Sequence, residues 1–229
     1  MIGHSFDLEA AASAEMVREG FHSDFPDGTE EQVAQIRAAA GAARRPAPAT
    51  GVRDLRGLVW SSIDNDTSRD LDQIEVAERV SGGIRVRVGI ADVSSSVLKD
   101  TPIDKHAAEQ TQTVYTAVKN FPMLPNELST DLTSLNENED RAADVVEFVV
   151  DAQGCVSGSR IFPAVVRNKA QLAYSKVGPW LQGSAGPDPK VAASAELQAQ
   201  LRLQDEAALA LRGERVRRGA LEFNRTEAD

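Results

Sequence analysis

Apolar and polar residues alternate most regularly over residues 84–90, IRVRVGI. A period of two predicts a strand that is half-buried on one face. A second β-like run, LRGLVWSSI, covers residues 55–63. Two further β-rich runs, residues 144–151 and 156–166, flank a turn at Gly154, and this arrangement predicts a hairpin.

The first 42 residues of the chain have a helical composition instead. Residues 7–19 and 29–42 are rich in Ala and Glu, and we expect a short helix in each. Thr29 with Gln32 three residues later has the form of a capping box. Two prolines among small residues then make residues 43–50 a predicted linker.

Two more helices are predicted farther along the chain. Thr101 followed by Pro102 resembles a helix start, so we expect a helix over residues 102–118. The breaker sequence GSAGPDP precedes a Leu-, Ala- and Arg-rich stretch that predicts a long helix over residues 190–216.

Charge and cysteine content limit the possible partners and compartments. The chain has 229 residues and a net charge of −10, so it repels a polyanion unless it offers a local basic surface. The single cysteine, Cys155, cannot form an internal disulfide, which favours the cytoplasm. Neither a run of ~18 apolar residues nor a secretory signal is visible, so we expect no membrane association.

Residues 63–73, IDNDTSRDLDQ, form an acidic segment that the pattern of apolar and polar positions does not explain. Asp64, Asp66, Asp70 and Asp72 fall within nine positions, at the end of one β-like run and before another. Like charges at this density raise a pKa or recruit a hard cation such as magnesium, manganese or calcium. A solvated acidic loop is the alternative.

An EF-hand calcium loop is a second alternative for this segment. Counting Asp64 as position one places Asp66 at three, Asp72 at nine and Glu75 at twelve, which is close to the EF-hand pattern. Arg69, however, stands where the EF-hand requires glycine, and both flanks are predicted strands rather than helices. We therefore regard calcium binding as a remote alternative.

The same acidic segment resembles the signature of the ribonuclease II and ribonuclease R family. Further blocks that are similar to the family follow in order: VGIADVSSSV, TVYTAVKNFPMLPNELSTDLTSLNENEDR, VVRNKAQLAYSKV and RRGALEFN. The resemblance implies an α+β fold, with a mixed β-sheet catalytic domain and surrounding helices over residues 51–229. This domain would be incomplete at its C-terminal end and preceded by a helical segment and linker, residues 1–50.

The resemblance also implies a set of metal-binding and catalytic residues. Asp64, Asp70 and Asp72 match three of the four active-site aspartates of the family, and Gln73 stands at the fourth position. The resemblance implies Mg²⁺ at this site, with Mn²⁺ as a substitute. Gln73 offers only a carbonyl oxygen, and Asp66 could supply the missing charge.

Aromatic and basic residues extend the resemblance to RNA binding. Tyr115 and Phe223 match positions that stack on the bases at the RNA 3′ end, and Tyr174 matches an aromatic residue near the active site. Arg167 and Lys169 belong to a basic cluster that could follow the phosphates.

The implied activity is that of a hydrolytic 3′-to-5′ exoribonuclease that degrades single-stranded RNA to nucleoside 5′-monophosphates. Residues expected downstream in the family lie beyond Asp229, so we expect either a second chain or further C-terminal residues to complete the domain. The alternative is a catalytically silent RNA-binding or regulatory module, which Gln73 favours.

Overall fold

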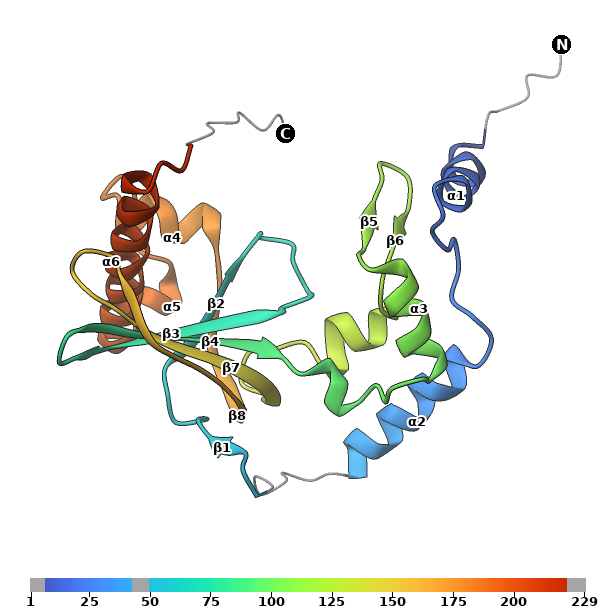
Figure 1. The fold of residues 1–229 in the computed structure, drawn as a ribbon, viewed down its shortest axis with the longest axis horizontal. Helices are drawn as coiled ribbons and strands as arrows, with labels where there is room; N and C mark the ends of the chain where they lie inside the picture. The colour runs from blue at the N-terminus through green and yellow to red at the C-terminus, as the bar shows by residue number, and fades with distance from the viewer. Residues whose placement is uncertain (1–6, 43–49, 222–229) are drawn as a thin grey trace, which may run out of the picture. The chain divides into compact units, whose positions relative to one another are not determined.

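The chain folds into two compact units, shown in a computed structural model that describes residues 7–42 and 50–221 (Figure 1). Unit 1 combines the described residues before position 46 with Asp92–Ser134. Unit 2 combines the described residues of Ala47–Ala91 with those of Leu135–Asp229. Each unit is described by itself below.

One mixed sheet forms the centre of unit 2. Its strands are β1 (Arg53–Asp54), β2 (Trp60–Asp64), β3 (Gln73–Val80), β4 (Gly83–Ala91), β7 (Asp140–Val150) and β8 (Val156–Ala173). Their order is β1-β8-β2-β3-β4-β7, and β8 also pairs with β7. This additional pairing closes β8, β2, β3, β4 and β7 into a ring.

Strand β8 changes partner along its length. Its first part pairs antiparallel with β7, from Val156 to Arg167, and its last part pairs parallel with β2. The register shifts between the pairs Trp60↔Asn168 and Ser61↔Ala170, which leaves Lys169 as the extra residue of a bulge. The strand ends with Ala173 opposite Asp64.

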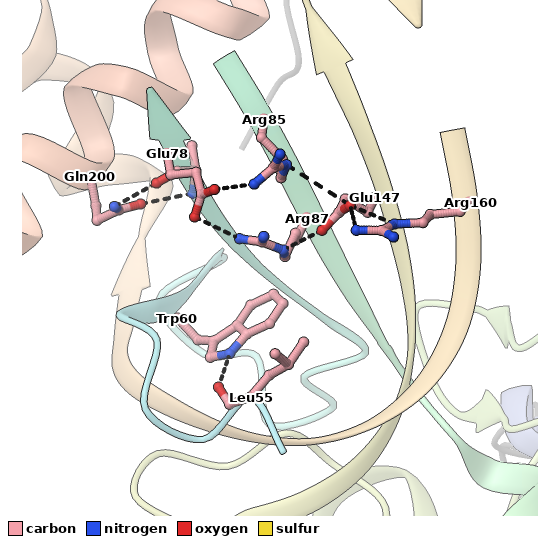
Figure 2. Close-up of polar contacts among 9 residues, drawn as sticks. Leu55, Trp60, Glu78, Arg85, Arg87, Glu147, Arg160 and Gln200 are labelled. Carbon is pink, nitrogen blue, oxygen red and sulfur yellow. Dashed lines mark hydrogen bonds and ion pairs between the residues drawn. The ribbon is translucent and has the colours of Figure 1, made fainter. Parts of the chain in front are cut away.

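Trp60 forms the centre of the apolar core in the ring. Its side chain is fully buried, and its indole N–H donates to the carbonyl oxygen of Leu55 over 2.8 Å (Figure 2). Leu71, Ile74 and other apolar side chains surround it. Gly89 leaves the space for this ring system, because a Cβ there would lie 3.2 Å from Ile74 Cγ1 and 3.5 Å from Trp60 Cζ3.

A network of charged side chains continues from this core along the sheet (Figure 2). Glu147, only 4% exposed, accepts hydrogen bonds from Arg87 Nε at 2.6 Å and Arg160 Nε at 2.7 Å. Glu78 pairs with Arg85 and Arg87. Burial opposes ionisation of Glu147, but the hydrogen bonds from Arg160 and Arg87 hold its pKa below the ordinary value.

Replacement of Glu147 tests the importance of this network. We expect Glu147→Gln to lower the free energy of unfolding of unit 2 by about 1–3 kcal/mol, because a neutral amide weakens the charge-assisted hydrogen bonds from Arg87 and Arg160, while Glu78 still pairs with Arg87. Both tryptophans, Trp60 and Trp180, lie in unit 2, so urea unfolding followed by their fluorescence reports this unit. Glu206→Gln, which removes an exposed pair with Arg79, is the control and should leave the urea midpoint unchanged.

Three helices accompany the sheet of unit 2: α4 (Tyr174–Leu181), α5 (Pro189–Ala192) and α6 (Ala195–Arg217). Helix α6 is fixed to β3 by Gln200, whose side chain accepts from the backbone N–H of Ala77 over 2.8 Å and donates to its carbonyl oxygen over 2.6 Å. The single helix expected over residues 190–216 is therefore two helices. Ser194 separates them, because its side chain accepts from the backbone N–H of Leu197 and caps α6.

Unit 1 is mostly helical and has a small apolar core of its own. It contains α1 (Leu8–Arg18), α2 (Thr29–Ala42), η1 (Val93–Ser95), α3 (Pro102–Gln110), β5 (Val114–Tyr115), β6 (Asn120–Phe121) and η2 (Leu128–Leu132). Val97, Ile103 and Leu128 are the buried residues of this core. Strands β5 and β6 pair as a hairpin.

The expected helix over residues 102–118 is wrong in its second half. Helix α3 ends at Gln110, and Thr111 adopts a left-handed backbone conformation with φ of 59°. The β-branched residues that follow suit a strand better than a helix. Thr113 instead accepts a hydrogen bond from the backbone N–H of Met123, which helps to hold the hairpin.

The capping box expected within α2 is also wrong, because Gln32 stabilises a different helix. Its side-chain oxygen accepts from the backbone N–H of Ile103 over 3.1 Å, and its side-chain nitrogen donates to Thr101 Oγ1 over 2.8 Å. Thr101 makes no capping hydrogen bond to α3 itself. Gln32 therefore caps the N-terminus of α3 from across unit 1.

The other element predictions are largely confirmed. Helices form within residues 7–19 and over 29–42, and the hairpin around Gly154 forms with longer strands than expected. The expected linker falls almost entirely outside the described residues. No helix within the described part of the chain is long and apolar enough to span a membrane.

Gln32→Ala tests the cap that α2 provides for α3. We expect faster amide exchange at Ile103, with a local loss of about 1 kcal/mol, as is typical when a helix cap is removed. Hydrogen exchange followed by NMR is the suitable measurement because unit 1 contains no tryptophan. Gln35→Ala, an exposed change in the same helix, is the control, and equal exchange in the two variants would contradict the proposed cap.

Candidate functional site

The acidic segment forms the loop between two neighbouring strands of unit 2. Strand β2 ends at Asp64 and β3 begins at Gln73, so Asp66, Asp70 and Asp72 lie in the connection. Both flanking elements are strands, which contradicts the EF-hand alternative because that motif needs two helices. The acidic residues are thus displayed at a strand end.

Several backbone contacts fix the second half of this loop. The carbonyl oxygen of Leu71 accepts from Leu135 N–H, and that of Asp72 accepts from Ala91 N–H, both over 2.9 Å. The Leu71 side chain is 1% exposed and packs in the core beside Trp60. The two carboxylates on either side of Leu71 are therefore held on a rigid backbone.

The negative charges in the loop act on one another. Desolvation, followed by the charges of Asp70 and Asp64, raises the pKa of Asp72. Within the described residues, none of the four loop aspartates has an ion-pair partner. Asp66 is exposed in a turn and is not among the groups that shift Asp72. The negative charge therefore concentrates on Asp64, Asp70 and Asp72.

This donor set fits a hard divalent cation in its chemistry. Carboxylate oxygens are the ligands that Mg²⁺ and Mn²⁺ prefer, and a cation would relieve the repulsion that raises the pKa of Asp72. The described side chains do not form a ready-made site, because no three His, Cys, Asp or Glu residues among them are arranged to hold a metal ion. The Gln73 side chain, at the start of β3, adds an amide rather than a fourth carboxylate.

Sequence reasoning did not assign a role in this region to Glu75. It lies opposite Ser61 in the pairing of β3 with β2, and the Ser61 hydroxyl is buried without a hydrogen-bond partner among the described residues. Burial raises the pKa of Glu75 to about 7. Its only signal in the sequence was its place at position twelve of the EF-hand pattern.

Tyr174 links this carboxyl group to the acidic loop. It is the first residue of α4 and directly follows Ala173, the strand partner of Asp64. Desolvation, followed by the charges of Asp64 and Glu75, raises the pKa of its hydroxyl group. Its side chain is 57% exposed. The structure thus brings Tyr174 near the acidic loop, as the sequence predicted.

The other predicted RNA-binding residues belong to different parts of the chain. Tyr115 lies in unit 1, on the β5–β6 hairpin, and is 68% exposed. Phe223 lies outside the described residues. Arg167 forms an ion pair with Asp140 at 2.5 Å, which gives this arginine a structural partner, whereas Lys169 occupies the bulge in β8.

The arginines at the end of α6 have a structural role. Arg217 and Arg218 both pair with Glu214, at 2.8 Å and 2.6 Å. The two arginines are exposed, so the end of α6 is a solvated charged face in which Glu214 compensates both of them.

Comparison with known families identifies the domain that contains the acidic loop. The model of the RNB domain matches residues 52–229, which include the whole of the loop. The chain belongs to the RNB domain family. The family assignment made from the acidic signature is thus confirmed, and the α+β class of the fold agrees with it.

Sequence relatives of this RNB domain are ribonucleases. Ribonuclease R of Vibrio parahaemolyticus is 34% identical over 209 residues, which cover 89% of this chain and 24% of that protein. The chain therefore spans about a quarter of the length of this relative.

Solved structures show the same fold. Ribonuclease R of Mycoplasma genitalium, in complex with ribose-methylated single-stranded RNA, has a TM-score of 0.77 at 24% identity and covers 93% of this chain and 32% of its own. Yeast Ssd1, described as a pseudonuclease, has a TM-score of 0.51 at 15% identity and covers 67% of this chain and 19% of its own. The fold alone therefore accommodates both a ribonuclease and a pseudonuclease.

Glu75 makes the stability of unit 2 depend on pH. Its pKa rises from 4.5 to about 7 on folding, so between these values the folded protein holds a proton that the unfolded chain has released. Stability should therefore fall as pH rises through this window, by about 1–3 kcal/mol. Tryptophan-detected urea unfolding between about pH 5.5 and 8 measures this change.

The matched variants for this measurement are Glu75→Gln and Asp66→Asn. Glu75→Gln cannot ionise and should flatten the profile, whereas Asp66→Asn, which alters an exposed residue of the adjacent loop, should keep the wild-type slope. The same slope in Glu75→Gln and wild type would rule out Glu75 as the cause.

Proposed function

We propose that this RNB domain belongs to a metal-dependent, hydrolytic 3′-to-5′ exoribonuclease that degrades single-stranded RNA to nucleoside 5′-monophosphates in the cytoplasm. One observation carries the proposal: three carboxylates without cationic partners among the described residues lie together at a strand end, where desolvation and the charges of the other two raise the pKa of Asp72. Carboxylate-held metal ions are a common means of hydrolysing phosphodiesters.

In this proposal Asp64, Asp70 and Asp72 hold Mg²⁺ or Mn²⁺, and the side-chain oxygen of Gln73 is the fourth ligand. The bound metal supplies Lewis-acid activation of water and charge compensation at the phosphate. The protein contributes the rigid backbone on both sides of Leu71, which keeps Asp70 and Asp72 in place without reorganisation.

The aromatic residues hold the RNA in this proposal. Tyr115, Tyr174 and Phe223 stack on bases near the 3′ end, and stacking contributes about 1–3 kcal/mol per base with little sequence preference. Tyr174, next to the acidic loop, is the described aromatic best placed to orient the terminal nucleotide. Lys169 is a better candidate for phosphate binding than Arg167, because Arg167 is paired with Asp140.

Gln73 favours a second candidate function, that of a catalytically silent RNA-binding or regulatory module. A neutral amide weakens the attraction for a divalent cation. The same fold occurs in a protein described as a pseudonuclease.

A time course with 3′-extended, labelled single-stranded RNA and Mg²⁺ tests the proposed activity. We expect Asp72→Asn to lower the rate of mononucleotide release by more than about a hundredfold, since losing a group that merely orients a metal ligand already costs about 10- to 100-fold. Asp66→Asn is the matched control and should stay within about twofold of wild type, because Asp66 does not shift Asp72.

Gln73→Asp separates the two candidate functions. Calorimetry should show tighter Mg²⁺ binding in this variant because a fourth carboxylate is restored. RNA binding without mononucleotide release, in wild type and Gln73→Asp alike, would refute the enzyme and support the silent module.

A further inference from the structure

The β5–β6 hairpin, which carries Tyr115, is too short to be stable by itself. Each strand has two residues, and an isolated two-stranded hairpin is marginal in water. Within its turn, Thr116 Oγ1 donates to the carbonyl oxygen of Lys119 over 2.6 Å and accepts from its N–H over 3.1 Å. The orientation of Tyr115 must therefore depend on what the hairpin contacts.

The N-terminal segment of the chain holds the hairpin through Lys119. The Lys119 ammonium group lies 3.7 Å from a carboxylate oxygen of Glu9, in α1, and 3.8 Å from one of Asp24. The same ammonium group is 5.2 Å from the centre of the Phe121 ring. Two exposed acidic side chains from before α2 thus lie within ion-pair distance of the one lysine in the hairpin.

The N-terminal segment also lines a pocket beside the hairpin. Phe121 is 1% exposed and borders a cavity of about 130 Å³, whose lining includes Phe25, His106 and Lys119. The Phe25 and His106 rings are in contact, with centroids 4.5 Å apart. Phe121 is thus closely packed in unit 1 and lies beside an open pocket that residues of the N-terminal segment also line.

Helix α3 fixes the N-terminal segment in turn. The backbone N–H of His22 donates to the side-chain oxygen of Gln110 over 3.0 Å, and His22 Nε2 lies 2.7 Å from a carboxylate oxygen of Glu109. The hairpin, the segment from Glu9 to Phe25 and the end of α3 therefore support one another within unit 1.

We propose that the N-terminal segment, residues 8–25, positions Tyr115 for stacking on RNA, with Glu9 and Asp24 as positioning residues that act through Lys119. This inference rests on the proposed function for the role of Tyr115. It assigns a purpose to a part of the chain that lies outside residues 52–229, the range of the RNB domain.

Lys119 could alternatively be a phosphate-binding cation that Glu9 and Asp24 merely neutralise. The two roles predict opposite results when the acidic residues are removed. Releasing a phosphate-binding lysine from two carboxylates strengthens RNA binding, whereas releasing the hairpin that orients Tyr115 weakens it.

The test compares Glu9→Gln/Asp24→Asn with the control Glu30→Gln/Glu31→Gln, in the full chain. The control removes the same net charge from two exposed residues in the first turn of α2. Amide exchange over residues 116–121, measured without RNA, should be about two- to fivefold faster in the first variant only. Equal exchange in both variants would overturn the inference.

RNA binding is measured with an oligonucleotide that carries 2-aminopurine at its 3′ end, so that stacking on Tyr115 quenches the fluorescence. We expect Glu9→Gln/Asp24→Asn to weaken binding about two- to fivefold and to reduce the quenching, and to do neither in a Tyr115→Ala background. Tighter binding, or an unchanged effect in Tyr115→Ala, would overturn the positioning role.

Phe25→Ala tests independently whether the N-terminal segment holds the hairpin. This substitution enlarges the pocket that Phe25 and Phe121 both line, without changing any charge. It should also speed amide exchange in the hairpin. If wild type does not bind RNA at all, the proposed function fails, while the exchange measurements still decide whether the segment holds the hairpin.

Discussion

The pairing of β8 with two different strands is the constraint on which unit 2 depends. The first part of β8 bonds to β7 and the last part to β2, with the bulge at Lys169 between them. This change of partner closes the sheet into a ring around Trp60. It also ends β8 opposite Asp64, so that Tyr174 follows directly beside the acidic loop.

The charged groups of the ring lie in two contrasting environments. At Glu147, burial is compensated by arginines that hold the carboxylate ionised. At the acidic loop, like charges lie together with no ion-pair partner among the described residues, and desolvation together with their repulsion raises the pKa of Asp72. The backbone hydrogen bonds to the carbonyl oxygens of Leu71 and Asp72 stabilise this second arrangement, because they fix the end of the loop independently of its charges.

Local patterns predicted those parts of the fold that local forces determine. The alternation over residues 84–90 marked β4, and the turn at Gly154 marked the hairpin of β7 and β8. The acidic signature located the candidate site because its residues are adjacent in sequence. In β4, however, the alternation of burial does not extend to Ile90, which is 41% exposed.

Long-range contacts decided the features that the sequence did not predict. Gln32 has the spacing of a capping box, yet its partners lie in another helix. Glu75 drew attention only as an EF-hand position, since its burial and its pairing with Ser61 depend on how β2 and β3 align. The ion pair of Arg167 with Asp140 likewise required the pairing of β7 with β8.

Unit 1 is built from two separate stretches of chain, and this determines when it can form during synthesis on the ribosome. Gln32 and its partner Ile103 are 71 positions apart, and the intervening residues include β1 to β4. Helix α2 therefore leaves the ribosome well before the helix that it caps. The N-terminal helices must wait, with their apolar side chains uncovered, until most of the first half of the chain has been made.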